Sequence, residues 1–196
     1  NSESIALLEQ ELKAKPGLPV MEDLTARLQL VFHYFAERNF SKANYAMLRL
    51  GRTDHWLEEH LGLEWLLKKN MGEMLIQLEL GHEDLALGRL KAIERSLVER
   101  FPAAPATVVA AEEPPTAATI AGGPYHFVLS YLGLVQAVIN NPASARSAEF
   151  AARVEEFPVF LPSEREDLQA MSFYAWLRAR MYGRPYYEVL LEVAEL

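Results

Sequence analysis

Apolar residues recur with helical spacing along most of the chain, and no segment shows the strict alternation of a half-buried strand. Short breaks that contain glycine, proline or asparagine separate the apolar segments, and helices commonly end at such residues. The pattern therefore predicts an all-α protein. Its expected helices cover residues 2–15, 21–38, 41–50, 56–80, 83–100, 125–140, 142–156, 163–182 and 185–196.

Residues that can accept a hydrogen bond from a first helical turn precede most of these segments. Ser163 and Glu166 have the spacing of a capping box, and Pro142 suits the first turn of a helix. The expected N-cap residues are Ser2 or Ser4, Ser41, Thr53 or Asp54, Asn141 and Ser163.

A segment rich in proline and alanine, residues 102–124, separates an N-terminal half, 1–101, from a C-terminal half, 125–196. Such a composition is typical of a linker or a long surface loop. Because each half is small and the apolar content is high, we expect the chain to form a single domain over 1–196.

The dividing segment lacks helical periodicity, yet it carries Val108, Val109 and Ile120, which a fully solvated linker seldom needs. We expect it to lie across or beside a groove between the two halves. A tether that does not contact the groove is the alternative.

The breaks between helices recur at a regular interval. They fall at Asn39, His82, Asn141 and Arg184, so that successive breaks are 43, 59 and 43 residues apart, and the longer interval contains residues 102–124. A fixed interval of this size is typical of stacked helical hairpins, each of which buries its apolar face on its neighbours. An irregular helical bundle is the alternative architecture.

The first two breaks also share a sequence pattern. In the first unit the pattern consists of Tyr34, Arg38, Asn39, Phe40 and Ala43, and in the second of Gln77, Gly81, His82 and Ala86. It resembles the turn of tetratricopeptide-repeat (TPR) proteins, in which a tyrosine precedes the turn and a small alanine follows it. Gly183 fits the turn of the last unit, and the third unit matches more loosely through Leu132, Gly133 and Ala145.

The resemblance extends over about 150 residues, although the interval is longer than the roughly 34 residues usual for that family. It implies a TPR-like superhelix built as an array of antiparallel helical hairpins. It also implies that the chain presents a surface to a protein or a peptide.

Charge and composition exclude several classes of function. The chain of 196 residues has a net charge of −8 and no run of basic residues, so binding to nucleic acid is not expected. It contains no cysteine, which removes disulfides and thiolate metal sites. No apolar run approaches the roughly 18 residues of a spanning helix, and the first residues lack a signal-peptide pattern. We therefore expect a cytoplasmic protein that does not bind membranes.

Two pairs of residues have spacings close to those of metal sites. His55 and His60 are five positions apart and so do not share a helix face. Glu79 and His82 match one half of a di-iron motif, which requires a second copy and further glutamates. Glycine-rich phosphate loops and nucleophile motifs are also missing. We expect no metal, no cofactor and no catalytic residue.

Lys68, Lys69 and Asn70 form a small basic spot. TPR domains that bind a terminal carboxylate carry lysine and asparagine on their first helices, but the matching positions here are Leu28 and Phe32. We therefore expect residues 68–70 to be a solvated face.

Two groups of large side chains could form either the core or a partner surface, and the core is the favoured interpretation for both. They comprise Trp56, Trp65, Met71, Met74 and Leu78, and, near the C-terminus, Phe173, Tyr174, Trp176, Tyr182, Tyr186 and Tyr187.

The predicted function is that of a non-catalytic helical-repeat module that binds a protein or a peptide, and a homodimer is one arrangement that the sequence allows. The alternative is a domain that binds or converts a small molecule at a site between the two halves. The expected binding groove consists of Phe32, Phe35, Lys68, Met71, Leu75, Phe127, Leu134, Phe173 and Arg180.

Overall fold

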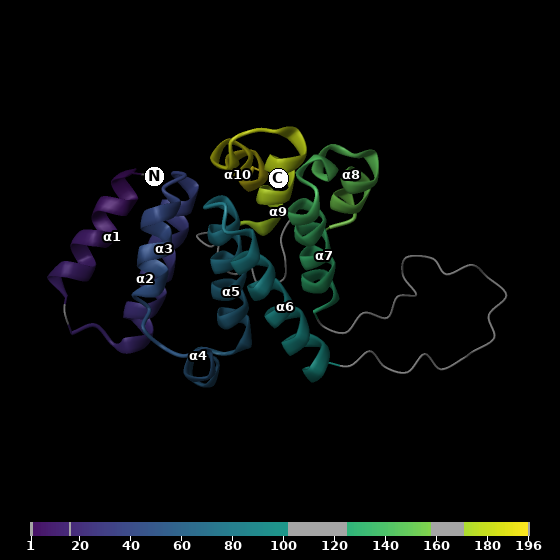
Figure 1. Cartoon of the computed structure of the whole chain (residues 1–196). Coiled ribbons are helices and arrows are strands. Elements are labelled where there is room, and N and C mark those ends of the chain that lie inside the picture. The colour runs from purple at the N-terminus through teal and green to yellow at the C-terminus, as the bar shows by residue number, and fades with distance from the viewer. Residues whose placement is uncertain (1, 16, 102–124, 158–170, 196) are drawn as a thin grey trace.

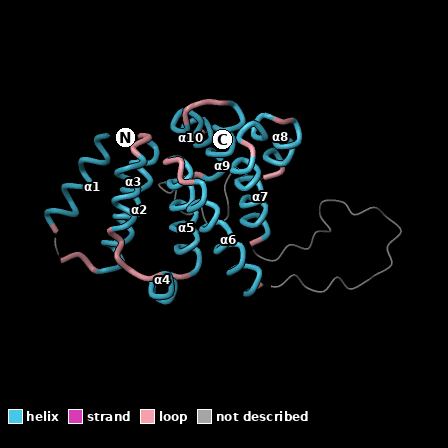
Figure 2. The backbone as a smooth tube through the Cα atoms, in the orientation of Figure 1, coloured by secondary structure: helices cyan, strands magenta, loops and turns pink. Residues whose placement is uncertain are grey.

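The computed structural model describes residues 2–15, 17–101, 125–157 and 171–195 (Figure 1). Every regular element in these ranges is a helix, which confirms the predicted all-α class for this part of the chain (Figure 2). None of these helices is both long and apolar enough to cross a membrane. The elements are α1 (Ser2–Ala14), α2 (Val20–Ala36), α3 (Phe40–Leu48), α4 (Asp54–Leu61), α5 (Leu63–Glu79), α6 (Glu83–Arg100), α7 (His126–Asn140), the short 3-10 helix η2 (Pro142–Arg146), α8 (Ala148–Glu155), α9 (Phe173–Tyr182) and α10 (Tyr186–Ala194).

The helices α2, α3, α5, α6 and α7 lie side by side in a row, and each contacts the next (Figure 1). The row has two ends, which are formed by the termini of its helices. One of these ends contains the α2–α3 turn, the α5–α6 turn and the C-terminus of α7, and α8, α9 and α10 gather there (Figure 1). The helix α4 lies at the opposite end, and α1 packs on the outer side of α2.

The core runs along the whole row. The helix α2 packs against α1, α3 and α5, and its side chains are therefore buried on several sides, as the nearly continuous apolar segment 28–35 predicts. The helix α1 contributes no fully buried residue. Its apolar stripe is half-buried against the core and consists of Ile5, Leu8 and Leu12.

The α2–α3 and α5–α6 turns have the same conformation. Arg38 and Gly81 adopt left-handed backbone angles, with φ of 57° and 79°. The next residues, Asn39 and His82, have φ of −90° and −91° and both have ψ of 65°. Each of these two residues donates its backbone N–H to the carbonyl five positions earlier, at 2.9 Å. The shared sequence pattern therefore produces a shared local structure.

The alanines that follow these turns are completely buried. Ala43 lies on α3 and Ala86 on α6, and neither is accessible to solvent. A small residue at this position lets the second helix of each pair approach the first closely.

The break at Asn141 differs from the other three. Asn141 is extended, with φ of −152°, and its side chain accepts a hydrogen bond from the Ala143 N–H at 3.1 Å. The cap predicted at Asn141 is confirmed, but the single helix predicted over 142–156 is wrong, because η2 ends before Ser147 and Ser147 caps the separate helix α8. Left-handed geometry returns at Gly183, between α9 and α10, with φ of 65°.

The predicted helix 56–80 is also wrong, because two helices occupy this range. Gly62 separates α4 from α5 with φ of 87° and ψ of 164°. Residues with a Cβ avoid this backbone region, so the chain turns sharply there. The apolar spacing continues through the break, which explains why the periodicity did not reveal it.

Three helix starts can be compared with the expected caps. Asn39, rather than Ser41, caps α3 by accepting from the Lys42 N–H at 3.3 Å. Thr53 caps α4, as one of the two predicted alternatives. For the predicted helix 163–182, residues 163–170 lie outside the described residues, and the described part forms α9, which begins at Phe173 and is capped by Ser172. The proposed capping box at Ser163 and Glu166 lies outside the described residues, as does the whole segment 102–124.

The last two helices return to the N-terminal half. The ring of Tyr186 on α10 meets the ring of Phe35 on α2 edge to face, with the centroids 5.3 Å apart. On α9, the indole Nε1–H of Trp176 donates to the Glu79 carboxylate at the end of α5, at 2.8 Å. An array in which each hairpin contacts only its neighbours does not predict these contacts, which close the row at one end.

Candidate functional site

A pocket of about 590 Å³ lies at the end of the row where the turns gather. Its walls come from the α2–α3 turn, the end of α5, the end of α7 with η2, and the α9–α10 turn. The pocket therefore lies between the N-terminal and C-terminal halves. Its volume falls in the range of roughly 300–1,000 Å³ typical of ligand sites.

The lining of this pocket is strongly basic. Four arginines, Arg38, Arg146, Arg180 and Arg184, line it together with a single carboxylate, Glu79. The formal charge of the lining is thus positive, in contrast to the net charge of −8 of the whole chain. We refer to it as the arginine pocket.

Glu79 is already engaged by α9. Its carboxylate accepts from Trp176 Nε1–H and forms an ion pair with Arg180, whose guanidinium also lies 5.2 Å from the centre of the Trp176 ring. Glu79 is the last residue of α5, where the helix dipole disfavours a negative charge. Its contacts across the two halves offset this disadvantage.

The other three arginines differ in their partners. Arg184 donates to Glu192 at 3.0 Å and to Glu188 at 3.4 Å, and its hydrogen bond lowers the pKa of Glu192. Arg38 and Arg146 are exposed, and their guanidinium groups form no hydrogen bond or ion pair with other described residues. Two guanidinium groups are therefore available to a ligand in the pocket.

The chemistry of the lining favours an anion. A guanidinium presents a planar fork of N–H donors that matches a carboxylate or a phosphate, and such charge-assisted bonds are stronger than neutral ones. The pocket wall also includes the aromatic side chains of Trp176 and Tyr186. The arrangement can therefore hold an acidic group beside an apolar one.

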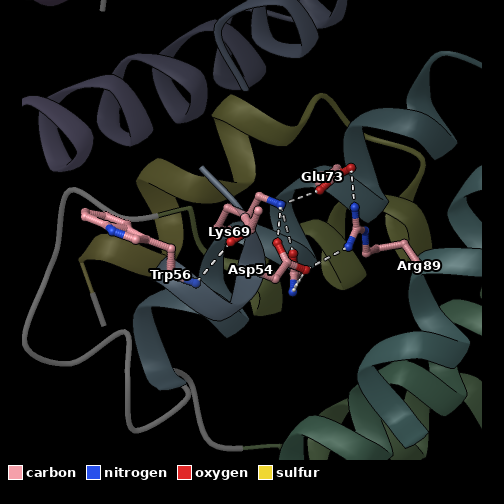
Figure 3. A network of polar contacts seen from close by, with 7 residues as sticks. Asp54, Trp56, Lys69, Glu73 and Arg89 are labelled. Carbon is pink, nitrogen blue, oxygen red and sulfur yellow. Dashed lines mark hydrogen bonds and ion pairs between the residues drawn. The ribbon is translucent and has the colours of Figure 1, made fainter. Parts of the chain in front are cut away.

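A second polar cluster joins α4, α5 and α6 (Figure 3). Lys69 Nζ donates to Asp54 at 3.0 Å and to Glu73 at 2.9 Å, and Arg89 donates to the same two carboxylates at 3.1 and 2.7 Å. Asn70 completes the cluster by donating to Asp54 at 3.2 Å and accepting from Lys69 at 3.1 Å.

This cluster, which we call the α4–α6 charge network, contains two cations and two carboxylates. Burial alone would raise the pKa of Asp54, but the hydrogen bond and charge of Lys69, with the charge of Arg89 and the hydrogen bond of Asn70, lower it overall. Because the charges balance and every member is paired within the cluster, we interpret it as a structural tie that holds α4 against α5 and α6.

The network corrects the prediction for residues 68–70. Lys69 and Asn70 are buried, each with 8% of its surface exposed, so they do not form a solvated face. Lys68 is half-buried. The neighbouring Asp54, at the start of α4, supplies the counter-charge that makes burial of Lys69 tolerable.

Most residues of the predicted groove belong to the core. Phe127 and Lys68 are half-buried, and only Arg180 lines the arginine pocket. Side chains that are buried in this way support packing and cannot contact a partner unless the helices separate. The six buried members are Phe32, Phe35, Met71, Leu75, Leu134 and Phe173.

The favoured core assignment holds for part of each large apolar group. In the first group Met71 and Met74 are buried, whereas Trp56, Trp65 and Leu78 are half-buried. Near the C-terminus, Phe173, Trp176 and Tyr186 are buried and Tyr174 is half-buried, but Tyr182 and Tyr187 are exposed.

The histidines weighed as metal ligands have other contacts. His60 stacks on Trp56, with ring centroids 4.0 Å apart, and His82 pairs with the side chain of Gln77 at 2.8 Å. Within the described ranges, no three histidine, aspartate or glutamate side chains are arranged to hold a metal ion.

Sequence analysis did not find the arginine pocket, because its arginines are far apart in the chain. The sequence pattern identified Arg38 and Arg184 only as residues at helix breaks. The positions of these two arginines nevertheless contained a signal. When breaks recur at a regular interval along a row of helices, the side chains at those breaks gather at the same end of the row.

The chain matches no protein-family model, no curated protein and no solved structure.

Proposed function

We propose that this chain is a non-catalytic binding module that holds an acidic segment of a protein or peptide partner in the arginine pocket. The observation that carries the proposal is the convergence of four arginines on a pocket with one carboxylate, with two guanidinium groups left without a partner in the described structure. The all-helical scaffold is consistent with an interaction module, although fold alone does not fix function.

The lining also supports a role without catalysis. Glu79, the carboxylate of the pocket, is held by Trp176 and Arg180. The Tyr186 hydroxyl accepts a hydrogen bond from the Ser172 N–H at 3.0 Å. With these groups engaged, the described lining offers donors that can bind an anion but no acceptor placed to remove a proton from it.

The overall charge shapes how such a partner would bind. At 0.1 M salt, charges more than about 10 Å apart are largely screened, so the net charge of −8 does not attract an acidic partner from a distance, and the arginines attract it only at short range. Recognition therefore depends on local contacts rather than on electrostatic steering. This favours a flexible acidic segment that can enter the pocket while the bulk of the partner stays outside.

The experiment is a fluorescence anisotropy titration of a fluorescein-labelled hexaglutamate peptide with blocked ends. The wild-type protein is expected to bind it, and binding is expected to weaken as salt is raised. Arg146→Ala is expected to weaken binding roughly tenfold, because one charge-assisted contact is lost.

Two controls make this result specific. A hexaglutamine peptide of the same length has no charge and is expected not to bind. Arg95→Ala removes an exposed arginine of α6 that does not line the pocket, and it is expected to bind hexaglutamate like wild type. Equal weakening by Arg95→Ala and Arg146→Ala would show that binding is non-specific and would contradict the proposal.

A second candidate function is the binding of a small anionic molecule, which is favoured by the position of the pocket between the two halves and by its moderate volume. Small di- and tricarboxylates that raise the melting midpoint, together with no binding of hexaglutamate, would favour this candidate over a peptide.

A further inference from the structure

Arg38 has an unusual backbone conformation. Among the described residues it is the non-glycine residue with positive φ, at 57°. The equivalent positions of the α5–α6 and α9–α10 turns carry Gly81 and Gly183, with φ of 79° and 65°. The left-handed region is unfavourable for residues with a Cβ, and glycine is the residue that adopts it without strain. Arginine at this turn is therefore a local cost to the fold.

The contacts of the Arg38 side chain do not offset this cost. The side chain is exposed, and its guanidinium takes part in none of the hydrogen bonds or ion pairs found among the described residues. The backbone of the turn makes its hydrogen bonds in the same way as at Gly81, where no side chain is present. The arginine is thus not needed to form the turn.

Arg38 differs from the other arginines of the pocket in the half of the chain that it comes from. It is the arginine that the N-terminal half contributes to the pocket, whereas Arg146, Arg180 and Arg184 all come from the C-terminal half. An anion bound by Arg38 and by an arginine of the other half would contact both halves at once.

We infer that Arg38 is a ligand-binding residue, retained in a strained conformation because its guanidinium contacts the acidic group that the pocket binds. The inference rests on the proposed function. Residues in sparsely populated backbone conformations often lie at binding sites, where the strain is tolerated for the sake of function. Arg38 therefore lowers the stability of the free protein and raises its affinity for the ligand.

The test compares three variants by thermal unfolding and by hexaglutamate binding. Arg38→Gly is expected to raise the melting midpoint by about 2–4 °C, because the strain is relieved, and to weaken binding roughly tenfold. Arg38→Lys keeps the charge and the strain, so its midpoint is expected to match wild type while binding falls only partly, since lysine lacks the planar fork.

Gly81→Arg is the matched control, because it places the same side chain at the same turn conformation of the next hairpin, outside the arginine pocket. It is expected to lower the melting midpoint by a similar few degrees and to leave binding unchanged.

The outcomes separate this inference from the proposed function. If wild type does not bind hexaglutamate, both fail. If wild type binds, Arg146→Ala weakens binding and Arg38→Gly does not, the proposed function stands and the inference is overturned. A lower melting midpoint for Arg38→Gly would also overturn it, because the arginine would then support the fold.

Discussion

At the scale of single residues, Asp54 shows how a charge at a helix start is used. It is the first residue of α4, and it faces the buried Lys69 and the guanidinium of Arg89. The α4–α6 charge network holds the pKa of Asp54 below its ordinary value, although burial acts in the opposite direction. The ionised form is therefore favoured by folding.

Asp54→Asn is expected to lower the free energy of unfolding at neutral pH by about 1–2 kcal/mol, because Lys69 and Arg89 lose a shared carboxylate whose partial exposure limits the effect. In the wild type, the contribution of ionised Asp54 to the free energy of unfolding is complete above the ordinary aspartate pKa of about 3.9. This contribution is lost as the pH falls through the lowered pKa of Asp54 in the folded state. The difference between variant and wild type should therefore be constant near neutrality and shrink below about pH 4.

Urea unfolding followed by circular dichroism at several pH values measures this difference. Glu59→Gln is the control, since it removes an exposed carboxylate of the same helix that lies outside the network. A difference between Asp54→Asn and wild type that persists unchanged into acid would show that the loss is not due to the charge of Asp54.

The sequence revealed less about these residues than about the helices around them. Lys69 pairs with Glu73 at the local i,i+4 spacing, but its other carboxylate, Asp54, lies 15 positions earlier, and no local pattern connects Asp54 with Lys69. The arginine pocket is a stronger case, because it exists only once α9 and α10 have docked. Of its arginines, Arg180 alone was predicted to bind a partner.

At the scale of helices, the predictions were most reliable at the two repeated turns. Ala43 and Ala86 are fully buried after turns of the same conformation, as the repeated pattern suggests. They failed at Gly62, because an apolar period that continues through a glycine fits one helix or two equally well. Tertiary contacts decide between these two, since Asp54 can reach Lys69 only because the chain turns back between them.

Gly62→Ala tests whether this turn is held by the fold. Near the added methyl group there is no atom within 4 Å, so the substitution creates backbone strain without a clash. We expect it to lower the free energy of unfolding by about 1–3 kcal/mol, as for other residues forced into this region. Denaturant unfolding checks the value, and circular dichroism of the native protein reports helix content.

Gly17→Ala is a useful control, because its Cβ also meets no neighbour and its φ is not positive. We expect it to be neutral or slightly stabilising. A Gly62→Ala variant that is more helical and more stable than wild type would mean that the continuous helix predicted from the sequence is the preferred state of this segment.

At the scale of the whole molecule, closure of the row by α9 and α10 distinguishes this structure from an open array of hairpins. The sequence could not predict this closure, because nothing local to the aromatic residues near the C-terminus indicates which earlier helices they contact. Phe35 and Glu79, the residues they meet, belong to helices far earlier in the chain.

The contact between Glu79 and α9 can be tested by two variants. Glu79→Ala leaves the buried Trp176 indole N–H without an acceptor and is expected to cost about 1–3 kcal/mol of stability. Glu79→Gln keeps an acceptor for the indole and loses the ion pair with Arg180, so we expect it to cost under about 1 kcal/mol.

Denaturant unfolding of the two variants gives these free energies, and Trp176 fluorescence, measured with Trp56 and Trp65 both replaced by phenylalanine, reports whether the indole remains buried. Equal losses for both variants would indicate that the ion pair, rather than the indole hydrogen bond, supports the closure.

The return of α9 and α10 to the first half of the chain also affects the order in which the protein assembles. Glu79 and Trp176 are 97 positions apart in sequence, so the loop that this contact closes is among the most costly in chain entropy. The α2–α3 and α5–α6 hairpins can form from local contacts while synthesis continues, but the end of the row stays uncovered until α9 and α10 have been made. During that interval the aromatic side chain of Phe35 lacks its Tyr186 partner, so we expect the nascent chain to be prone to aggregation until α10 has been made.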